Sequence, residues 1–421
     1  MKFWFRAFGC RVNQCEIEEL RARLAEAGCA LVQELSEAEV CVVNTCTVTR
    51  DADREAFKFL RRLRRDHPKA RLVVTGCLAT RDPGALRSAF PHALVVDNSG
   101  KDALPEALGL SLDPEPRAVA RRRSRAFLKI QDGCDWGCSY CVVPRVRPKL
   151  WSLAPERAAR RVRRLVEEGV PEIVLCGIRL GRYSCADAAG KELDLAGLVA
   201  RLLELPGTFR LRLSSLELGE AGDRLAGLIA DSGGRVCPHL HLPLQSGSDA
   251  VLRRMKRPYL AADFALRVEA LSRRIPGVAL FTDIMTGFPG ESEAEFREGL
   301  KFVERIGFRG LHVFRYSARP GTPAAACAEQ IPPAVARERL DICKELDRSL
   351  RQAHLRAAAG QERVAVPLET RSSGVTEDFL AVRLDPQPGP GLWRVRVGAG
   401  HAPARVLGPW QEGFSERTIV G

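Results

Sequence analysis

A run of alternating strand-like and helix-length segments begins near residue 127 and constrains the fold more than any other feature. Six short, mainly apolar stretches recur there, and helix-length sequence separates each from the next. Strands that alternate with helices favour a parallel sheet, and six units are fewer than the eight of a complete barrel. We therefore predict an open, partial (βα)6 barrel whose site lies at the carboxyl ends of its strands. The stretches are residues 127–130, 172–176, 210–215, 239–244, 278–285 and 311–316.

The first 109 residues show the same alternation on a smaller scale, which predicts a parallel α/β domain. Strands are expected at residues 3–8, 40–43 and 72–74, and helices at 17–26 and 54–65. Each predicted strand ends in a turn with a cysteine, namely Cys10, Cys46 and Cys77. Because the carboxyl ends of parallel strands meet at one edge of a sheet, we predict a three-cysteine site at that edge.

Two changes in composition divide the rest of the chain. Residues 110–126 lose the alternation and contain prolines and a run of arginines, which predicts a basic linker. After a predicted helix at 333–359, four alternating segments separated by glycine and proline predict a small all-β module. The chain is thus expected to be an α/β protein divided into 1–109, 110–126, 127–359 and 360–421.

Composition narrows the setting of the protein. Of 421 residues, 45% are hydrophobic and 28% charged, which is typical of a globular chain with more than one domain. We see no apolar stretch of signal-peptide or membrane-spanning length, so we expect a cytoplasmic protein that stays out of membranes. Cysteines are reduced in that compartment, and clusters among the 14 therefore indicate metal ligands. The net charge of +13 favours a nucleic-acid partner, although a solvated basic surface explains it equally well.

Cys134, Cys138 and Cys141 form a CxxxCxxC spacing directly after the first barrel strand. Gly133 and Gly137 are expected to let the backbone curl around a cluster while the thiolates point inward. Three thiolates bind three irons of a 4Fe-4S cluster and leave the fourth iron open, as a catalytic metal site requires. A zinc site or an electron-transfer cluster is the alternative, but each normally takes a fourth protein ligand.

These motifs resemble those of the radical S-adenosylmethionine (SAM) methylthiotransferase family over essentially the whole chain. The three strand-end cysteines match that family's N-terminal motifs in segments 9–14, 43–49 and 75–77. Segments 211–217, 239–248 and 286–291 resemble its barrel strands, and segment 316–323 resembles its closing motif. The β module occupies the position of the family's RNA-binding TRAM domain.

The resemblance implies a cofactor set and a reaction. It implies SAM and two 4Fe-4S clusters, an auxiliary one on Cys10, Cys46 and Cys77 and a radical-forming one on Cys134, Cys138 and Cys141. Because cofactors then carry the hard chemistry, we predict no side-chain acid or base as a catalytic residue. Segments 10–14, 44–49, 129–134 and 212–217 most resemble the branch that methylthiolates C2 of N6-threonylcarbamoyladenosine beside the tRNA anticodon. The implied partners are tRNA, an electron donor and a sulfur source, and we expect a monomer.

Further candidates lie at predicted barrel strand ends or near the barrel mouth. Gly177, Glu217, Gln245 and Ser246 are candidates for binding SAM, with helix capping or loop pairing as the alternative. Arg145, Arg147, Arg315 and Arg319 are candidates for the substrate carboxylate, with phosphate contacts as the alternative. Segment 144–152 departs from the family pattern. The other eight cysteines are interpreted as structural, Cys15 least securely.

Two other functions remain open at this point. A different methylthiotransferase branch acts on isopentenyl-adenosine in tRNA or on an aspartate of a ribosomal protein. A non-catalytic iron-sulfur protein that binds RNA would share the cysteines and the charge, but would never convert SAM into 5′-deoxyadenosine.

Overall fold

The computed structural model describes residues 1–111, 124–368 and 372–411, so residues 112–123 of the predicted linker lie outside the described ranges. The described residues form two compact units. The first gathers residues 1–111, 132–151 and 317–326, and the second gathers 124–131, 152–316 and the described residues from 327 onward. The first unit therefore contains all six cysteines predicted as cluster ligands.

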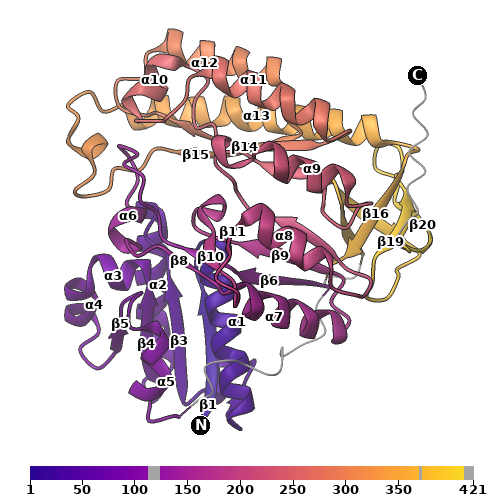
Figure 1. The fold of residues 1–421 in the computed structure, drawn as a ribbon. Helices are drawn as coiled ribbons and strands as arrows, with labels where there is room; N and C mark the ends of the chain where they lie inside the picture. The colour runs from indigo at the N-terminus through magenta and orange to yellow at the C-terminus, as the bar shows by residue number, and fades with distance from the viewer. Residues whose placement is uncertain (112–123, 369–371, 412–421) are drawn as a thin grey trace. The chain divides into compact units, whose positions relative to one another are not determined.

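A five-stranded parallel sheet, ordered β2-β1-β3-β4-β5, forms the centre of the first unit (Figure 1). Phe3, Val40 and Val42 pack on α1, whereas the alternate residues Cys41 and Val43 pack against α2, α3 and α4. This burial of both faces explains why the strands are almost continuously apolar. The elements are β1 (Lys2–Ala7), α1 (Arg11–Glu26), β2 (Ala30–Leu31), β3 (Val40–Thr45), α2 (Arg50–Asp66), β4 (Arg71–Gly76), α3 (Cys77–Arg81), α4 (Pro83–Ala89), β5 (Leu94–Val96), α5 (Leu104–Ala107) and α6 (Val143–Val146).

The predicted parallel α/β domain is confirmed, with two further strands, three further short helices and earlier starts of α1 and α2. Strands β2 and β5 have two and three residues, too few to show a periodic pattern. Helix α1 begins at Arg11 rather than near residue 17, because its first turn is mainly polar and shows no apolar period, although Val12 and Asn13 are buried in it. This early start makes Cys10 the residue that caps the helix.

The second unit contains the predicted six-stranded partial barrel. Strands β6, β9 and β12 form one parallel sheet and β13, β14 and β15 another; a parallel bridge from Ser215 to His241 joins the two sets. The elements are β6 (Arg125–Lys129), α7 (Pro155–Glu167), β9 (Glu172–Cys176), β10 (Ser184–Ala186), β11 (Glu192–Asp194), α8 (Leu195–Leu203), β12 (Arg210–Leu213), α9 (Asp223–Asp231), β13 (His239–His241), α10 (Asp249–Arg254), α11 (Ala261–Arg274), β14 (Ala279–Thr286), α12 (Glu293–Ile306), β15 (Gly310–Arg315) and α13 (Pro333–Ala358).

Short elements complete the description. Strands β7 (Gln131–Asp132) and β8 (Trp151–Ser152) flank the predicted radical cluster loop in the sequence. Single turns of 3₁₀ helix occur at Leu35–Glu37, Lys101–Ala103, Leu180–Arg182, Leu218–Glu220 and Pro323–Ala326.

Side chains alternate between the two faces of the barrel strands. Leu211, Leu213 and Ile173 belong to the apolar layer under the helices, whereas their neighbours Arg210 and Arg212 face the inside of the barrel. The inside therefore holds charge. Buried Glu172 on β9 forms ion pairs with Arg125, Arg210 and Arg212, with N to O distances of 2.6, 2.6 and 3.0 Å.

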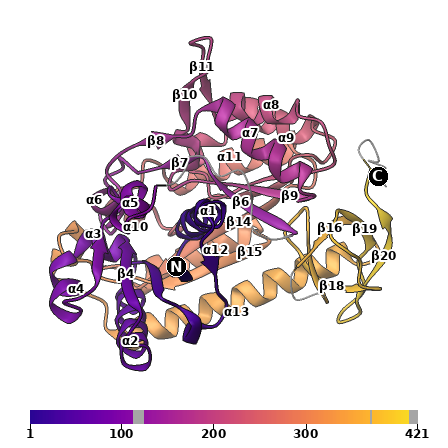
Figure 2. The same ribbon diagram turned by 90° about the horizontal axis from the view of Figure 1, so that it is seen from below.

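The C-terminal β module is a closed five-stranded barrel at the end of α13 (Figure 2). Its strands are β16 (Glu362–Pro367), β17 (Ser373–Thr376), β18 (Ala381–Asp385), β19 (Trp393–Arg396) and β20 (Ala404–Pro409). Arg210 Nη1 donates to the Val364 carbonyl oxygen at 2.6 Å, and Arg212 Nη2 donates to that of Thr376 at 2.8 Å. The buried charges of the partial barrel thus fasten this module to it.

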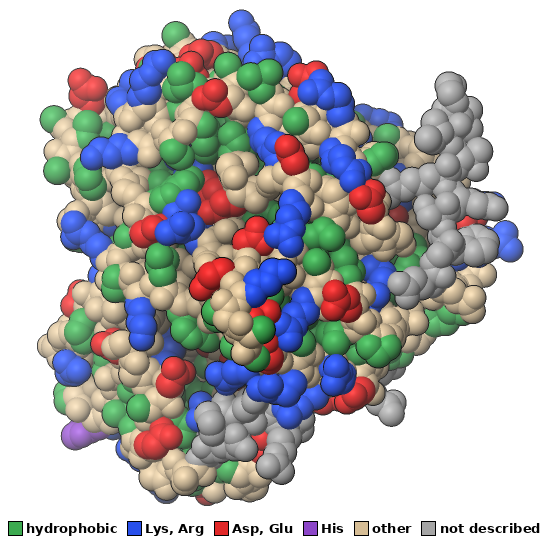
Figure 3. Space-filling model, in the orientation of Figure 1, with side chains coloured by type: hydrophobic (Ala, Val, Ile, Leu, Met, Phe, Trp, Pro, Cys, Tyr) green, Lys and Arg blue, Asp and Glu red, His purple; other side chains and the backbone are tan. Residues whose placement is uncertain are grey.

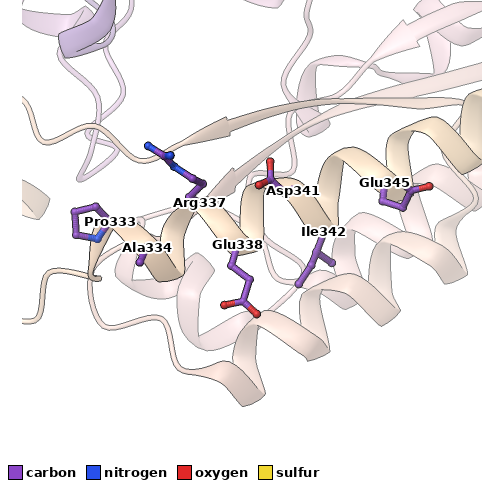
Figure 4. A pocket seen from close by; sticks show the side chains of 7 residues that line it. All are labelled: Pro333, Ala334, Arg337, Glu338, Asp341, Ile342 and Glu345. Atoms are coloured by element: carbon purple, nitrogen blue, oxygen red, sulfur yellow. The ribbon is translucent and has the colours of Figure 1, made fainter.

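The described surface carries mixed charge and a pocket on α13. Within the described residues, no helix is both long and apolar enough to cross a bilayer. Figure 3 shows lysine and arginine side chains spread over one face with acidic side chains among them. A surface pocket lies along α13, and one helix supplies its whole lining (Figure 4): Pro333, Ala334, Arg337, Glu338, Asp341, Ile342 and Glu345. It contains none of the predicted site residues.

Candidate iron-sulfur site

Cys10, Cys46 and Cys77 follow the carboxyl ends of three adjacent strands, β1, β3 and β4. Cys10 caps α1, and Cys77 is the first residue of α3. Burial raises the pKa of Cys46 to about 12, and the neighbouring Cys77 and Cys10 thiols raise it further. Cys46 is therefore a protonated thiol at neutral pH until a metal displaces the proton. The prediction that the three cysteines share one sheet edge is confirmed.

Two asparagines and two glycines give this edge its shape. Asn13 Nδ2 donates to the Thr45 carbonyl oxygen at 3.1 Å, and Asn44 Nδ2 donates to that of Asn13 at 3.0 Å, so the first turn of α1 is tied to the end of β3. Gly76 has a φ of +100°, and a Cβ there would overlap Asn44 Oδ1. Gly9 has a φ of +83° and lies against the side chain of Cys46. Only glycine fits both positions.

Replacing Gly9 by alanine is expected to empty the auxiliary site. The new Cβ would lie 2.5 Å from Cys46 Cβ and 2.6 Å from its Sγ, so the cysteine must move. Iron per reconstituted chain should fall by about half, because one of two 4Fe-4S clusters is lost. Gly28→Ala is the matched control: its φ is +76°, but nothing lies within 4 Å of the added Cβ. Equal iron content in the two variants would contradict this account.

The loop with Cys134, Cys138 and Cys141 is folded back on itself. The Cys134 N–H donates to the Arg147 carbonyl oxygen at 3.2 Å, and the Cys141 N–H donates to that of Cys138 at 3.1 Å. Gly133 has a φ of +84°, and a Cβ there would overlap the Lys149 carbonyl oxygen. Gly137 is different, since a Cβ there meets nothing within 4 Å and its φ is not positive. The conformation and contacts of Gly133 thus favour glycine there, whereas those of Gly137 show no such requirement.

Direct contacts join the two cysteine sets within the first unit. Cys77 packs against Val142 and Val146, which follow Cys141 in the chain. Asn98 Nδ2 donates to the Val146 carbonyl oxygen at 2.8 Å and lies 3.7 Å from Cys77 Sγ. Asn98 was missed from the sequence, because a bridging amide has no characteristic spacing.

One sulfur atom in each set accepts a hydrogen bond, as cluster ligands commonly do. The Val143 N–H donates to Cys141 Sγ at 3.4 Å, and Asn98 Nδ2 donates to Cys77 Sγ at 3.7 Å. In each set, three thiols lie on glycine-shaped backbone, which is the donor set of a cluster with one open iron. The residues present therefore fit two such clusters.

Arg147 and Arg319 have carboxylate partners within the same unit. Arg147 is 4% exposed; its Nη1 lies 2.8 Å from Glu16 Oε1 and 2.7 Å from Asp132 Oδ2. Arg319 is 1% exposed, and its Nη2 lies 2.5 Å from Asp53 Oδ2. These pairs fasten the cysteine loop and the closing segment to the N-terminal sheet and helices. This placement favours a structural role for both arginines over the predicted contact with substrate.

Arg145 and Arg315 are placed differently. Arg145 is exposed, and its guanidinium lies against the backbone of Gly321, which has a φ of +82°. Arg315 is half-buried at the end of β15 in the second unit. These two remain the predicted substrate contacts.

The predicted SAM-binding residues all belong to the second unit. Glu217 pairs with Arg257 and begins a 3₁₀ turn whose capping box it shares with Glu220. Burial raises the pKa of the Glu217 carboxyl, and the Arg257 charge opposes that shift. Arg257 was missed, since an arginine 40 residues after Glu217 in the sequence has no periodic relation to it.

The other three residues have distinct surroundings. Gln245 has a φ of +74°, and its buried Oε1 has no hydrogen-bond partner among the described residues. Gln245 and Ser246 line a small cavity against α12 with Phe296 and Gly299. At Gly177, a Cβ would lie 2.9 Å from Gln131 Oε1, so the close approach seen there is to a protein side chain.

Comparison with known proteins connects this arrangement to a family. Residues 2–97 match the family described as uncharacterized protein family UPF0004, and residues 128–303 match the radical SAM superfamily. The threonylcarbamoyladenosine tRNA methylthiotransferase MtaB of Thermotoga maritima is 32% identical over 378 residues, 85% of this chain and 84% of that protein. The chain belongs to the radical SAM methylthiotransferase family. It is an enzyme of that chemistry, whose cofactors are SAM and 4Fe-4S clusters.

Other relatives of this methylthiotransferase are named for a different substrate. The tRNA-2-methylthio-N(6)-dimethylallyladenosine synthase of Acidithiobacillus ferrooxidans is 33% identical over 86% of this chain and 85% of that protein. Among solved structures, the radical SAM methyltransferase TsrM of Kitasatospora setae has a TM-score of 0.56 at 15% identity, with 77% of each chain covered. That likeness shows the shared fold. Family membership decides against a non-catalytic iron-sulfur protein.

Proposed function

We propose that the methylthiotransferase inserts a methylthio group at C2 of N6-threonylcarbamoyladenosine in tRNA. Methylthiolation is supported by one observation above all: two three-cysteine sets lie in one compact unit. They are joined there through Cys77, Asn98 and Val146. Two neighbouring clusters, each with one iron that no cysteine binds, suit a reaction that needs both a radical and a carrier of sulfur.

The proposed ligand assignment follows the two sets. Cys134, Cys138 and Cys141 hold the radical SAM cluster, and Cys10, Cys46 and Cys77 hold the auxiliary cluster. When bound, the first supplies the electron that splits SAM into a 5′-deoxyadenosyl radical, and the second supplies an iron that holds sulfur. The protein's own residues position these sites: Asn98 donates a hydrogen bond to Cys77, and Arg147 holds the cysteine loop against α1.

The proposed substrate rests on the similar proteins and on charge. Four relatives at 32–36% identity are named threonylcarbamoyladenosine tRNA methylthiotransferase. The threonylcarbamoyl group carries a carboxylate, for which the exposed Arg145 and the half-buried Arg315 are chemically apt partners. A dimethylallyladenosine substrate is the second candidate, favoured by the relative at 33% identity, and it offers no carboxylate to these arginines.

Deletion of the gene is expected to remove 2-methylthio-N6-threonylcarbamoyladenosine from tRNA and to leave its unmodified precursor. Nucleoside mass spectrometry of total tRNA measures both. Complementation with the Arg145→Ala variant should restore less product than the wild type, whereas the exposed Arg253→Ala control should restore it fully. An unchanged level in the deletion strain would refute the proposed substrate, and loss of the dimethylallyl product would establish the second candidate.

A further inference from the structure

His241, Asp283 and His312 lie on three neighbouring strands of the partial barrel, β13, β14 and β15. Their sequence neighbours Leu240, Leu242, Ile284, Leu311 and Val313 pack in the apolar layer under the helices. Because side chains alternate along a strand, the two histidines and the aspartate project from the opposite, inner face. The methylthiolation scheme leaves all three without a role.

The donor atoms of these side chains form a compact triangle. His241 Nε2 lies 2.9 Å from Asp283 Oδ1, and His312 Nδ1 lies 3.5 Å from the same oxygen. All three donor atoms lie within 4.8 Å of one another. A tetrahedral ion with ligands at 2.0–2.1 Å needs separations of about 3.3 Å between them. The two contacts to Oδ1 are within a few tenths of an ångström of that separation, and the two imidazole nitrogens, which lie no more than 4.8 Å apart, would have to approach each other to bind one ion.

Charge balance also favours a cation at this place. The Asp283 side chain is 22% exposed, and among the described residues its ion-pair partners are these two histidines, which are charged only when protonated. Among the described residues no lysine or arginine pairs with this largely buried carboxylate, so no permanent positive charge offsets it. A divalent ion held by all three residues would supply that charge.

We propose that His241, Asp283 and His312 bind a divalent transition-metal ion of the zinc type, separate from the two iron-sulfur clusters. Two imidazoles and one carboxylate select such an ion over magnesium or calcium, which prefer oxygen ligands. Three protein ligands leave a coordination position for water or for an atom of a bound molecule. The site would also join β13, β14 and β15 across the inside of the barrel. This proposal does not depend on which nucleoside is the substrate.

Zinc binding by the holoenzyme tests the proposal directly. Protein with both clusters reconstituted is dialysed against Zn²⁺, and zinc and iron are then measured per chain. We expect one zinc per wild-type chain with no loss of iron. Asp283→Asn and His312→Ala should each weaken zinc binding at least about tenfold. The His312 side chain is 51% exposed, so its removal should not prevent folding.

A control and a second measurement make the outcome decisive. His401 is an exposed histidine of the β module, and His401→Ala should bind zinc like the wild type. Zinc should raise the midpoint of thermal unfolding of the wild type and of this control, but not of the two site variants. Zinc uptake that persists in both site variants, or that is matched by a loss of iron, would overturn the proposal. A wild-type holoenzyme that takes up no zinc would also overturn it, and the three side chains would then be only a hydrogen-bonded triad.

Discussion

Replacing Cys138 by alanine is expected to abolish formation of 5′-deoxyadenosine, whereas replacing Cys46 leaves that reaction intact and abolishes sulfur insertion. The first change removes one of the three thiolates proposed for the radical SAM cluster. The second removes a buried thiol at the end of β3, where it lies against Gly9. Assay of SAM cleavage by the reduced, reconstituted protein and mass spectrometry of the tRNA product measure the two activities separately.

Cys46 suits this test better than Cys77. Cys77 packs against Val142 and Val146 in the segment that follows Cys141, so its loss can disturb both sites. Cys15 supplies the control: it lies on α1, five residues after Cys10, and is interpreted as a buried structural residue. Cys15→Ala should keep both activities. Equal loss of SAM cleavage in the Cys138 and Cys46 variants would contradict the division of labour between the clusters.

Replacing Glu172 by glutamine is expected to destabilise the second unit by about 3–5 kcal/mol. Glu172 is the buried carboxylate between Arg125, Arg210 and Arg212, and its removal leaves three guanidinium groups without that counter-charge. Two of these arginines also hold carbonyl oxygens of the β module, so the module should loosen together with the barrel. Denaturant unfolding followed by circular dichroism measures the loss. The exposed Glu298→Gln on α12 should change stability by less than about 0.5 kcal/mol.

The same pairing predicts the direction of a pH effect. Burial alone would raise the pKa of Glu172, but the charges of Arg212, Arg210 and Arg125 outweigh it and hold the pKa well below its ordinary value. The folded state therefore binds a proton less readily than the unfolded chain. The stabilisation is complete above the unfolded pKa of about 4.3 and is lost as the pH falls from there through the lower folded value. A wild-type protein that loses no more stability on acidification than the Glu172→Gln variant would contradict this assignment.

The fold class was predictable because its signals are local. Each barrel strand is a short apolar run followed by a helix-length segment, and the periods of two and about 3.6 residues are visible without tertiary information. Helix α13 was predictable to within one residue, whereas β2, β5 and β17 were missed because two to four residues show no period. The charged inner face of β12 is also visible in the sequence, since Arg210 and Arg212 alternate with leucines.

By itself, the sequence determined the main strands of both sheets and the turns that follow them, and so placed Cys10, Cys46 and Cys77 at the ends of strands and Cys134, Cys138 and Cys141 on one loop. Only the tertiary structure decided which groups neutralise the buried charges. Arg147 pairs with Glu16 across 131 residues, and Arg319 pairs with Asp53 across 266. An arginine that binds substrate and one that fastens two segments look alike in a sequence. The difference is the partner, which a buried charge requires and which chain folding alone brings near.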